Sequence, residues 1–282
     1  MAEILDMETL CQWIGRTDTA RDLVTPQKTR ELRATLDLEP GQPQIGDEAP
    51  LTTHWCLAPP TAALHATGSD GHPARGGFLP PVPLPRRMWA GGSLEFDHPV
   101  RVGDEVTRVS RIRDVTAKEG RTGLLCFATV DHEISTPRGV AIRERQDIVY
   151  RGVDAPAGGQ GKAEPSRTAT WQESVHPGPV MLFRYSAVTF NSHRIHYDRD
   201  YCLTQEGYPG LVVHGPLQAT LLVELAARLL KRTPATFSFR SVRPLFDGAP
   251  MTLNACEGAT GLDLWTADTQ GRAAMLAQAT RR

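Results

Sequence analysis

The sequence has little cysteine and no surplus of charge of either sign. Its 282 residues contain 31 lysines and arginines against 32 aspartates and glutamates, so the formal net charge is −1. Such a balance creates no overall field that would recruit nucleic acid or an anionic membrane, and we expect neither as a partner. The 5 cysteines are widely spaced without a Cys-x-x-Cys pair, which argues against a disulfide framework or a zinc ribbon.

Long apolar runs are also missing. No segment approaches the roughly 20 apolar residues that a membrane-spanning helix needs. Near the N-terminus, Glu3, Asp6 and Glu8 precede any basic residue, which is unlike a signal or transit peptide. We therefore expect a cytoplasmic protein.

The chain is long enough for two domains that each bury a core. Residues 153–165 concentrate glycine and proline, with no large apolar residue beyond Val153, which is typical of a linker. This predicts an N-terminal domain over residues 1–152 and a C-terminal domain over residues 166–282. Residues 158–162 lack the spacing of a phosphate-binding loop.

Each half combines helical and extended patterns. In the first, Thr25 and Pro26 predict the start of a helix that reaches Leu36, and a meander of antiparallel strands follows from Ser93 to Tyr150. In the second, we predict a strand at 183–188, a helix at 216–230 with leucines every four residues, and strands at 236–242, 251–256, 262–267 and 273–279. The pattern predicts an α+β fold with antiparallel sheets.

The segment from Asn191 to Asp198 concentrates side chains that can take part in a reaction. It holds His193 and His196, and a neutral imidazole can take a proton from water and return it. Two other interpretations stay open. The histidines could bind a metal, although no matching Cys/His pair occurs elsewhere, or they could cap a turn. Asp198 is better explained as the N-cap of a short helix.

A short apolar run leads into Gly215 and Pro216, where the long helix should begin. Free N–H groups and the positive end of the helix dipole could bind a thioester carbonyl there. An ordinary helix cap would have the same sequence.

Together these segments resemble the MaoC-like and type 2 hydroxyacyl-thioester dehydratase family of hotdog-fold enzymes. The family's Asp-x-Asn-Pro-x-His motif, aligned on His196, places Asn191 where the family has its catalytic aspartate. Three segments of the N-terminal half, at 54–60, 85–92 and 144–151, also resemble the family's hydratases of branched C5 dicarboxylyl-CoA esters, including mesaconyl-C4-CoA and itaconyl-CoA.

The resemblance implies a double hotdog, two antiparallel sheets each wrapped round a central helix, with the catalytic residues in the C-terminal domain. It implies a hydro-lyase that needs no metal or redox cofactor and acts on an acyl-CoA, and a homodimer. His196 and Asn191 would be catalytic, with Asn191 able only to orient water because an amide is no base. The other implied site residues are Gly215 and Leu217 for the thioester, His193, Arg194, His214 and Tyr185 for the acyl group, and Arg86, Arg87, Arg240 and Arg243 for coenzyme A.

Three alternatives remain at this stage. The chain could be a generic 3-hydroxyacyl-thioester dehydratase of the fatty-acid type. It could be an acyl-thioester binding protein without activity, since the aspartate is absent. It could also be a thioesterase, which would ordinarily use a carboxylate, and Asp198 is the only one in the motif.

Overall fold

The computed structural model describes residues 5–120, 123–152 and 168–281. The predicted linker at 153–165 lies outside the described residues, so the domain boundaries stay predictions. Among the helices described, none is both long and apolar enough to cross a membrane.

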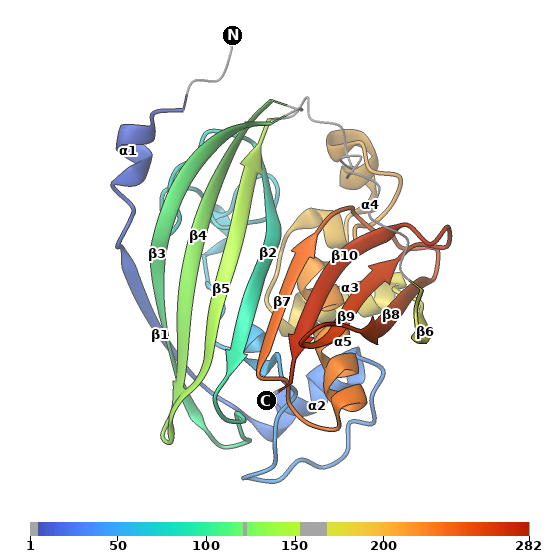
Figure 1. Cartoon of the computed structure of the whole chain (residues 1–282). Helices are drawn as coiled ribbons and strands as arrows, with labels where there is room; N and C mark the ends of the chain where they lie inside the picture. Colours follow the sequence, from blue (N-terminus) through green and yellow to red (C-terminus); the bar gives the residue numbers. More distant parts are fainter. Residues whose placement is uncertain (1–4, 121–122, 153–167, 282) are drawn as a thin grey trace.

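Strands from both halves form one antiparallel sheet, in the order β1-β3-β4-β5-β2-β7-β10-β9-β8-β6 (Figure 1). The N-terminal half supplies β1 (Thr17–Leu23), β2 (Arg86–Phe96), β3 (Glu105–Gly120), β4 (Gly123–Thr136) and β5 (Gly139–Arg151). The C-terminal half supplies β6 (Trp171–Val175), β7 (Thr236–Ser241), β8 (Met251–Glu257), β9 (Gly261–Ala267) and β10 (Ala273–Thr280).

The halves meet where β2 pairs with β7, from Gly91 opposite Arg240 to Glu95 opposite Thr236. The backbones approach closely here. A Cβ atom at Gly91 would lie 2.5 Å from the carbonyl oxygen of Phe239. Glycine at this position therefore lets the two sheets join into one.

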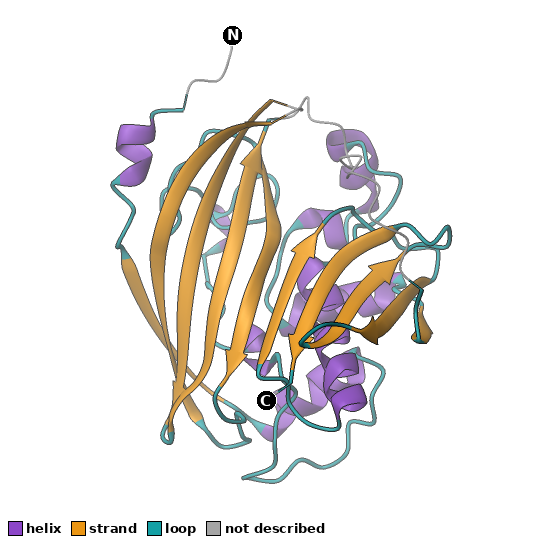
Figure 2. Cartoon of the chain, viewed as in Figure 1, coloured by secondary structure: helices purple, strands orange, loops and turns teal. Residues whose placement is uncertain are grey.

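The helices lie on one side of this sheet, apart from α1 at its outer edge (Figure 2). The long helix α5 (Gly215–Leu230) packs against β7, β8, β9 and β10 and buries its leucine stripe, as predicted. The other helical segments are α1 (Met7–Cys11), α2 (Pro26–Thr35), η1 (Thr53–Cys56), η2 (Leu64–Ala66), α3 (Pro179–Val188), η3 (Arg194–His196), α4 (Arg199–Tyr201) and η4 (Cys202–Glu206).

Helix α2 confirms the predicted helix, with the Thr25 hydroxyl accepting a hydrogen bond from the Lys28 N–H. The predicted strand at 183–188 is wrong, because these residues belong to α3. Leu182, Tyr185 and Ser186 are buried at spacings of three and four, which is the period of a helix.

The larger hydrophobic core joins the halves, since Leu94 and Phe96 of β2 belong to the same cluster as Leu217, Leu222 and Leu225 of α5. A smaller core lies under the N-terminal sheet. There the proline-rich segment 78–84, not a long helix, packs against β3, β4 and β5. Because no bulky helix fills this position in the described part of the N-terminal half, space remains for a cavity between the halves.

Candidate active site

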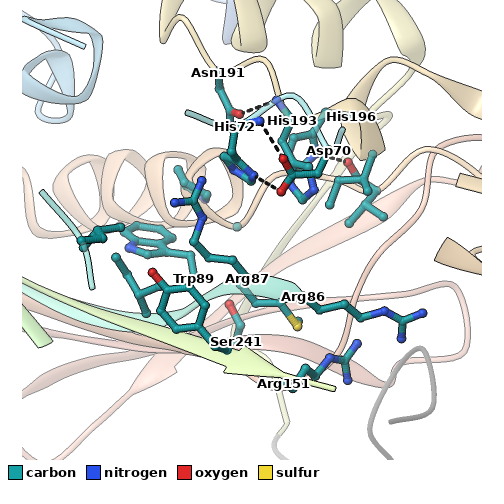
Figure 3. Close-up of a pocket in the computed structure, with 18 of the residues that line it drawn as sticks. Asp70, His72, Arg86, Arg87, Trp89, Arg151, Asn191, His193, His196 and Ser241 are labelled. Atoms are coloured by element: carbon teal, nitrogen blue, oxygen red, sulfur yellow. Dashed lines mark hydrogen bonds and ion pairs between the residues drawn. The ribbon is translucent and has the colours of Figure 1, made fainter. Parts of the chain in front are cut away.

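A cavity of about 520 Å³ lies between the halves, and both halves line it (Figure 3). The N-terminal half contributes Asp70 and His72 from a loop, Arg86 to Trp89 from β2 and Ile148, Tyr150 and Arg151 from β5. The C-terminal half contributes Asn191, His193 and His196, the start of α5 at Gly215, and the segment from Ser241 to Pro244.

His196 lies in η3, is buried, and is held by the segment that leads into α5. Its Nδ1 is 2.7 Å from the carbonyl oxygen of Val212. Because a carbonyl only accepts, Nδ1 carries the proton and Nε2 keeps a lone pair, for which no partner occurs among the described residues. Burial lowers the pKa of His196 to about 4, so this ring is neutral near neutral pH and suited to act as a base.

Behind His196 lies His214, which is fully buried. The two rings stack with their centroids 3.6 Å apart and their planes 18° apart. His214 Nε2 is 2.9 Å from the Ser186 hydroxyl, and the Tyr185 ring lies 5.0 Å from the His214 ring. Since neither His214 nor Tyr185 lines the cavity, their contacts orient His196 rather than reach an acyl group.

Asn191 and His193 form the turn before His196. The Asn191 Oδ1 accepts a hydrogen bond of 3.0 Å from the His193 N–H, so this amide already has a structural task. The His193 ring lies 5.5 Å from the His196 ring, edge to face. Burial, then the neighbouring His72 and His196, hold the pKa of His193 far below its usual value.

Asp70 and His72 face this segment from the other half of the chain. Both oxygens of the Asp70 carboxylate accept hydrogen bonds of 3.0 Å, one from the His72 N–H and the other from its ring Nδ1. The His72 ring lies 4.1 Å from the His193 ring. Burial alone would raise the pKa of Asp70, but the hydrogen bonds and charge of His72 outweigh it, so the pKa is lowered and the carboxylate is ionised.

Among the described residues, Asp70, His72 and His193 are the group most able to hold a metal. Ligand atoms of these three side chains all lie within 4.8 Å of one another. Both carboxylate oxygens accept a hydrogen bond from His72, one of them from the ring Nδ1, which is the arrangement of a carboxylate that orients a histidine. We therefore interpret the group as a hydrogen-bonded Asp–His pair beside His193.

The start of α5 closes the cavity next to His196. Gly215 lines the cavity, and a Cβ atom there would lie 3.4 Å from the Trp89 ring and 3.6 Å from the Ser241 hydroxyl. The first N–H groups of a helix have no partner within it, which fits the predicted thioester-binding role of Gly215 and of the Leu217 N–H. The Leu217 side chain itself is buried in the core.

Arg194 does not point into the cavity. Its guanidinium contacts Asp198 Oδ2 at 2.8 Å and 3.0 Å and lies over the Tyr201 ring. Asp198 accepts the Tyr201 N–H at 3.0 Å, as its predicted N-cap role requires. Both side chains thus brace the outer side of the catalytic segment.

The four arginines predicted for coenzyme A lie in different places: three line the cavity and one does not. Arg86 pairs with Glu206 at one end of the cavity, with 3.2 Å between Nε and Oε2, whereas Arg87 extends towards His72 and Asn191 (Figure 3). Arg243 also lines the cavity, and Arg240 is exposed outside it.

Sequence reasoning missed Asp70, His72, Trp89, Tyr150 and Arg151, all from the N-terminal half. Asp70 and His72 lie in a loop from Thr67 to Pro85 that is rich in glycine and proline, and no site residue was predicted in it from the sequence. Asp-Gly-His within it is the one local signal that could have pointed to the pair, because two polar chemical groups flank a glycine there.

Comparisons with known proteins agree with this geometry. A family model described as hydroxyacyl-thioester dehydratase type 2 matches residues 52–247, which include both walls of the cavity. The chain is 45% identical over 267 residues to mesaconyl-C4-CoA hydratase of Chloroflexus aurantiacus, covering 94% of this chain and 95% of that relative.

Two solved structures show the same fold at low identity. A MaoC-like dehydratase from Phytophthora capsici matches with a TM-score of 0.71 at 13% identity, covering 99% of both chains. A Mycobacterium tuberculosis protein described as a double hotdog matches with a TM-score of 0.52 at 14% identity, covering 95% of this chain and 96% of that one. The predicted double-hotdog fold is confirmed. Two details of the prediction are corrected: the two sheets join into one through β2 and β7, and no long helix packs against the sheet in the described part of the N-terminal half.

Proposed function

The chain belongs to the hydroxyacyl-thioester dehydratase type 2 family, and we propose that it adds water reversibly to the double bond of a branched C5 dicarboxylyl-CoA, with mesaconyl-C4-CoA as the preferred substrate. As a member of this family with a hydratase relative at 45% identity, it is a hydro-lyase acting on acyl thioesters. One observation is the main support for the hydration reaction. His196 presents an unpaired Nε2 to the cavity beside the start of α5.

The proposed reaction needs a base and a site for the enolate oxygen. One O–H bond of water breaks as its proton moves to His196 Nε2, and the water oxygen bonds to the β-carbon. The π electrons move into the enolate, whose oxygen lies at the N–H groups and positive dipole of the α5 start. His196 then returns the proton to the α-carbon, so the protein ends unchanged.

A dicarboxylyl substrate also needs a cation near the histidines, and we propose Arg87 for it in place of Arg194. Arg87 is half-buried in the cavity wall, and its positive charge counteracts the rise that burial causes in the pKa of the Tyr150 hydroxyl. No carboxylate of the described residues pairs with it. Arg194, by contrast, already has Asp198. A guanidinium in this position can bind a substrate carboxylate through two hydrogen bonds.

For coenzyme A we propose Arg86 and Arg243, which line the cavity, with Arg240 outside it on the surface. Proton transfer by histidine completes the reaction without a metal or redox cofactor, and we propose that none takes part. A cytoplasmic location and a homodimer also stay proposals. Activity after treatment with EDTA and light scattering behind a sizing column test the cofactor and the dimer.

The second candidate function is that of a generic 3-hydroxyacyl-thioester dehydratase, which the description of the family favours. Thioester hydrolysis is less compatible with the site, because Asp198 is bound to Arg194 and Tyr201. The two carboxylates that line the cavity are also engaged, Asp70 by His72 and Glu206 by Arg86. The test is incubation with mesaconyl-C4-CoA, itaconyl-CoA and crotonyl-CoA, following the enoyl-thioester absorbance and free thiol separately. We expect absorbance loss without thiol release, fastest with mesaconyl-C4-CoA. Thiol release would mean a thioesterase, and neither signal would mean a binding protein.

A further inference from the structure

We propose that Asp70 and His72, contributed by the N-terminal half, form the second water-binding group of the site and take over the task of the carboxylate that is absent at Asn191. This inference rests on the proposed hydration reaction. It assigns a catalytic residue, His72, and a residue that positions it, Asp70.

The loop that carries the pair is fixed to the catalytic segment. The Arg194 N–H donates to the Asp70 carbonyl at 2.9 Å, the Arg194 guanidinium donates to the Ser69 carbonyl at 3.1 Å, and the Ser192 hydroxyl donates to the Gly71 carbonyl. At Gly71, φ is +88° and a Cβ atom would lie 2.0 Å from the Ser192 carbonyl oxygen. Glycine is therefore required for this close contact, which brings two distant parts of the chain together.

The hydrogen bond within the pair determines which ring nitrogen of His72 carries the proton. Asp70 Oδ2 accepts from His72 Nδ1, so Nδ1 carries the proton and Nε2 keeps a lone pair. No hydrogen-bond partner for Nε2 occurs among the described residues. His72 and Asp70 line the same cavity as His196, and the His193 ring contacts the rings of both His72 and His196 (Figure 3).

His72 and His196 therefore line one cavity from opposite halves of the chain, each with an Nε2 that has no hydrogen-bond partner among the described residues. A water molecule has two O–H groups, and we assign one to His196 Nε2 and the other to His72 Nε2. With both hydrogens held, an oxygen lone pair is directed at the β-carbon. The Asn191 oxygen already accepts the His193 N–H, and an amide cannot take a proton from water, so Asn191 does not replace the absent carboxylate.

The experiment compares His72→Ala and Asp70→Asn with His65→Ala, an exposed histidine of η2 just before the loop. Hydration of mesaconyl-C4-CoA and crotonyl-CoA gives kcat and KM, each with and without added imidazole. Thermal unfolding checks each fold, and His72→Gln replaces His72→Ala if the alanine variant does not fold.

We expect His72→Ala to lower kcat by about 10²-fold on both substrates with little change in KM, and imidazole to restore part of it. Asp70→Asn should lower kcat roughly 10-fold, because asparagine has one acceptor oxygen for the two His72 donors that Asp70 now holds, and it carries no charge. His65→Ala should match the wild type. Normal kcat in His72→Ala, or a loss without rescue by imidazole, would overturn the inference. So would loss of wild-type activity in EDTA with recovery in zinc, since His72 would then be a metal ligand. A wild type that hydrates none of these thioesters would instead refute the proposed function.

Discussion

Replacing Arg87 by methionine should separate dicarboxylyl from simple acyl substrates. Methionine keeps much of the length and apolar contact of the arginine stem but removes its charge. Crotonyl-CoA has no second carboxylate, so it loses nothing when the guanidinium is removed. Mesaconyl-C4-CoA would be left with an unpaired carboxylate inside the cavity.

The size of the effect follows from the position of Arg87. At about 4 Å between charges and an effective dielectric constant near 20, the pair attracts with roughly 4 kcal/mol before desolvation. Truncating one partner of a buried, hydrogen-bonded charge pair typically costs about 2 to 5 kcal/mol. Since about 1.4 kcal/mol corresponds to tenfold, kcat/KM for mesaconyl-C4-CoA should fall roughly 30- to 4,000-fold.

The assay is the loss of enoyl-thioester absorbance with each substrate at limiting concentration, which gives kcat/KM directly. Arg194→Met is the matched control, because Arg194 braces the catalytic segment through Asp198 and Ser69 and should affect both substrates alike. An equal loss on both substrates in Arg87→Met would refute the assignment of the substrate carboxylate to Arg87.

Further predictions concern the protonation and stability of the site. Because burial lowers the pKa of His196 to about 4, the acidic limb of the kcat/KM profile for crotonyl-CoA should lie near pH 4, whereas a limb near 6.5 would contradict a buried base. His196→Ala should lower kcat by about 10²-fold or more with an unchanged circular dichroism spectrum. Asn191→Asp should keep or raise crotonyl-CoA turnover, since an aspartate can still accept the His193 N–H and adds a second acceptor for water; a 100-fold loss would show that the amide N–H₂ is needed. Burial alone would raise the pKa of Glu144, but His54, His132 and Gln146 lower it to about 2. The ionised Glu144 therefore stabilises the folded protein fully above the usual pKa of 4.5, and this stabilisation is lost as the pH falls through 2. Glu144→Gln should therefore cost up to about 3 kcal/mol in urea unfolding at pH 7, with the difference from wild type shrinking towards pH 3.

The sequence predicted those elements whose pattern is local. The leucine repeat of α5 and the Thr25 cap of α2 each identify a helix within one window of residues. The prediction for residues 183–188 failed because apolar and polar side chains alternate from Phe183 to Ser186 as in a strand. Only the burial of Leu182, Tyr185 and Ser186 shows the helical period. Strands β1 and β6 were missed because they are polar and mostly exposed at the two outer edges, so they show no buried face.

The site residues that could be predicted are likewise those that lie close together in the sequence. Asn191, His193 and His196 are close in sequence and could be recognised as one motif. His72 lies more than a hundred residues away and is brought there by backbone contacts of Gly71 with Ser192, which no local pattern contains. Arg86 and Arg87 are neighbours in sequence with identical side chains, so only the cavity shows that one pairs with Glu206 and the other extends to the histidines.

The pairing of β2 with β7 holds the two halves together without the peptide link between them. Each strand satisfies the other's main-chain hydrogen bonds along one edge, and the shared core of Leu94 with Leu217 and Leu222 reinforces them. Separated halves would each expose an unpaired edge and part of a core, which promotes aggregation. Expressed together as fragments 1–152 and 166–282, they should instead reassemble into an active complex, because the specificity of the pairing lies in its surfaces and not in the peptide bonds between them.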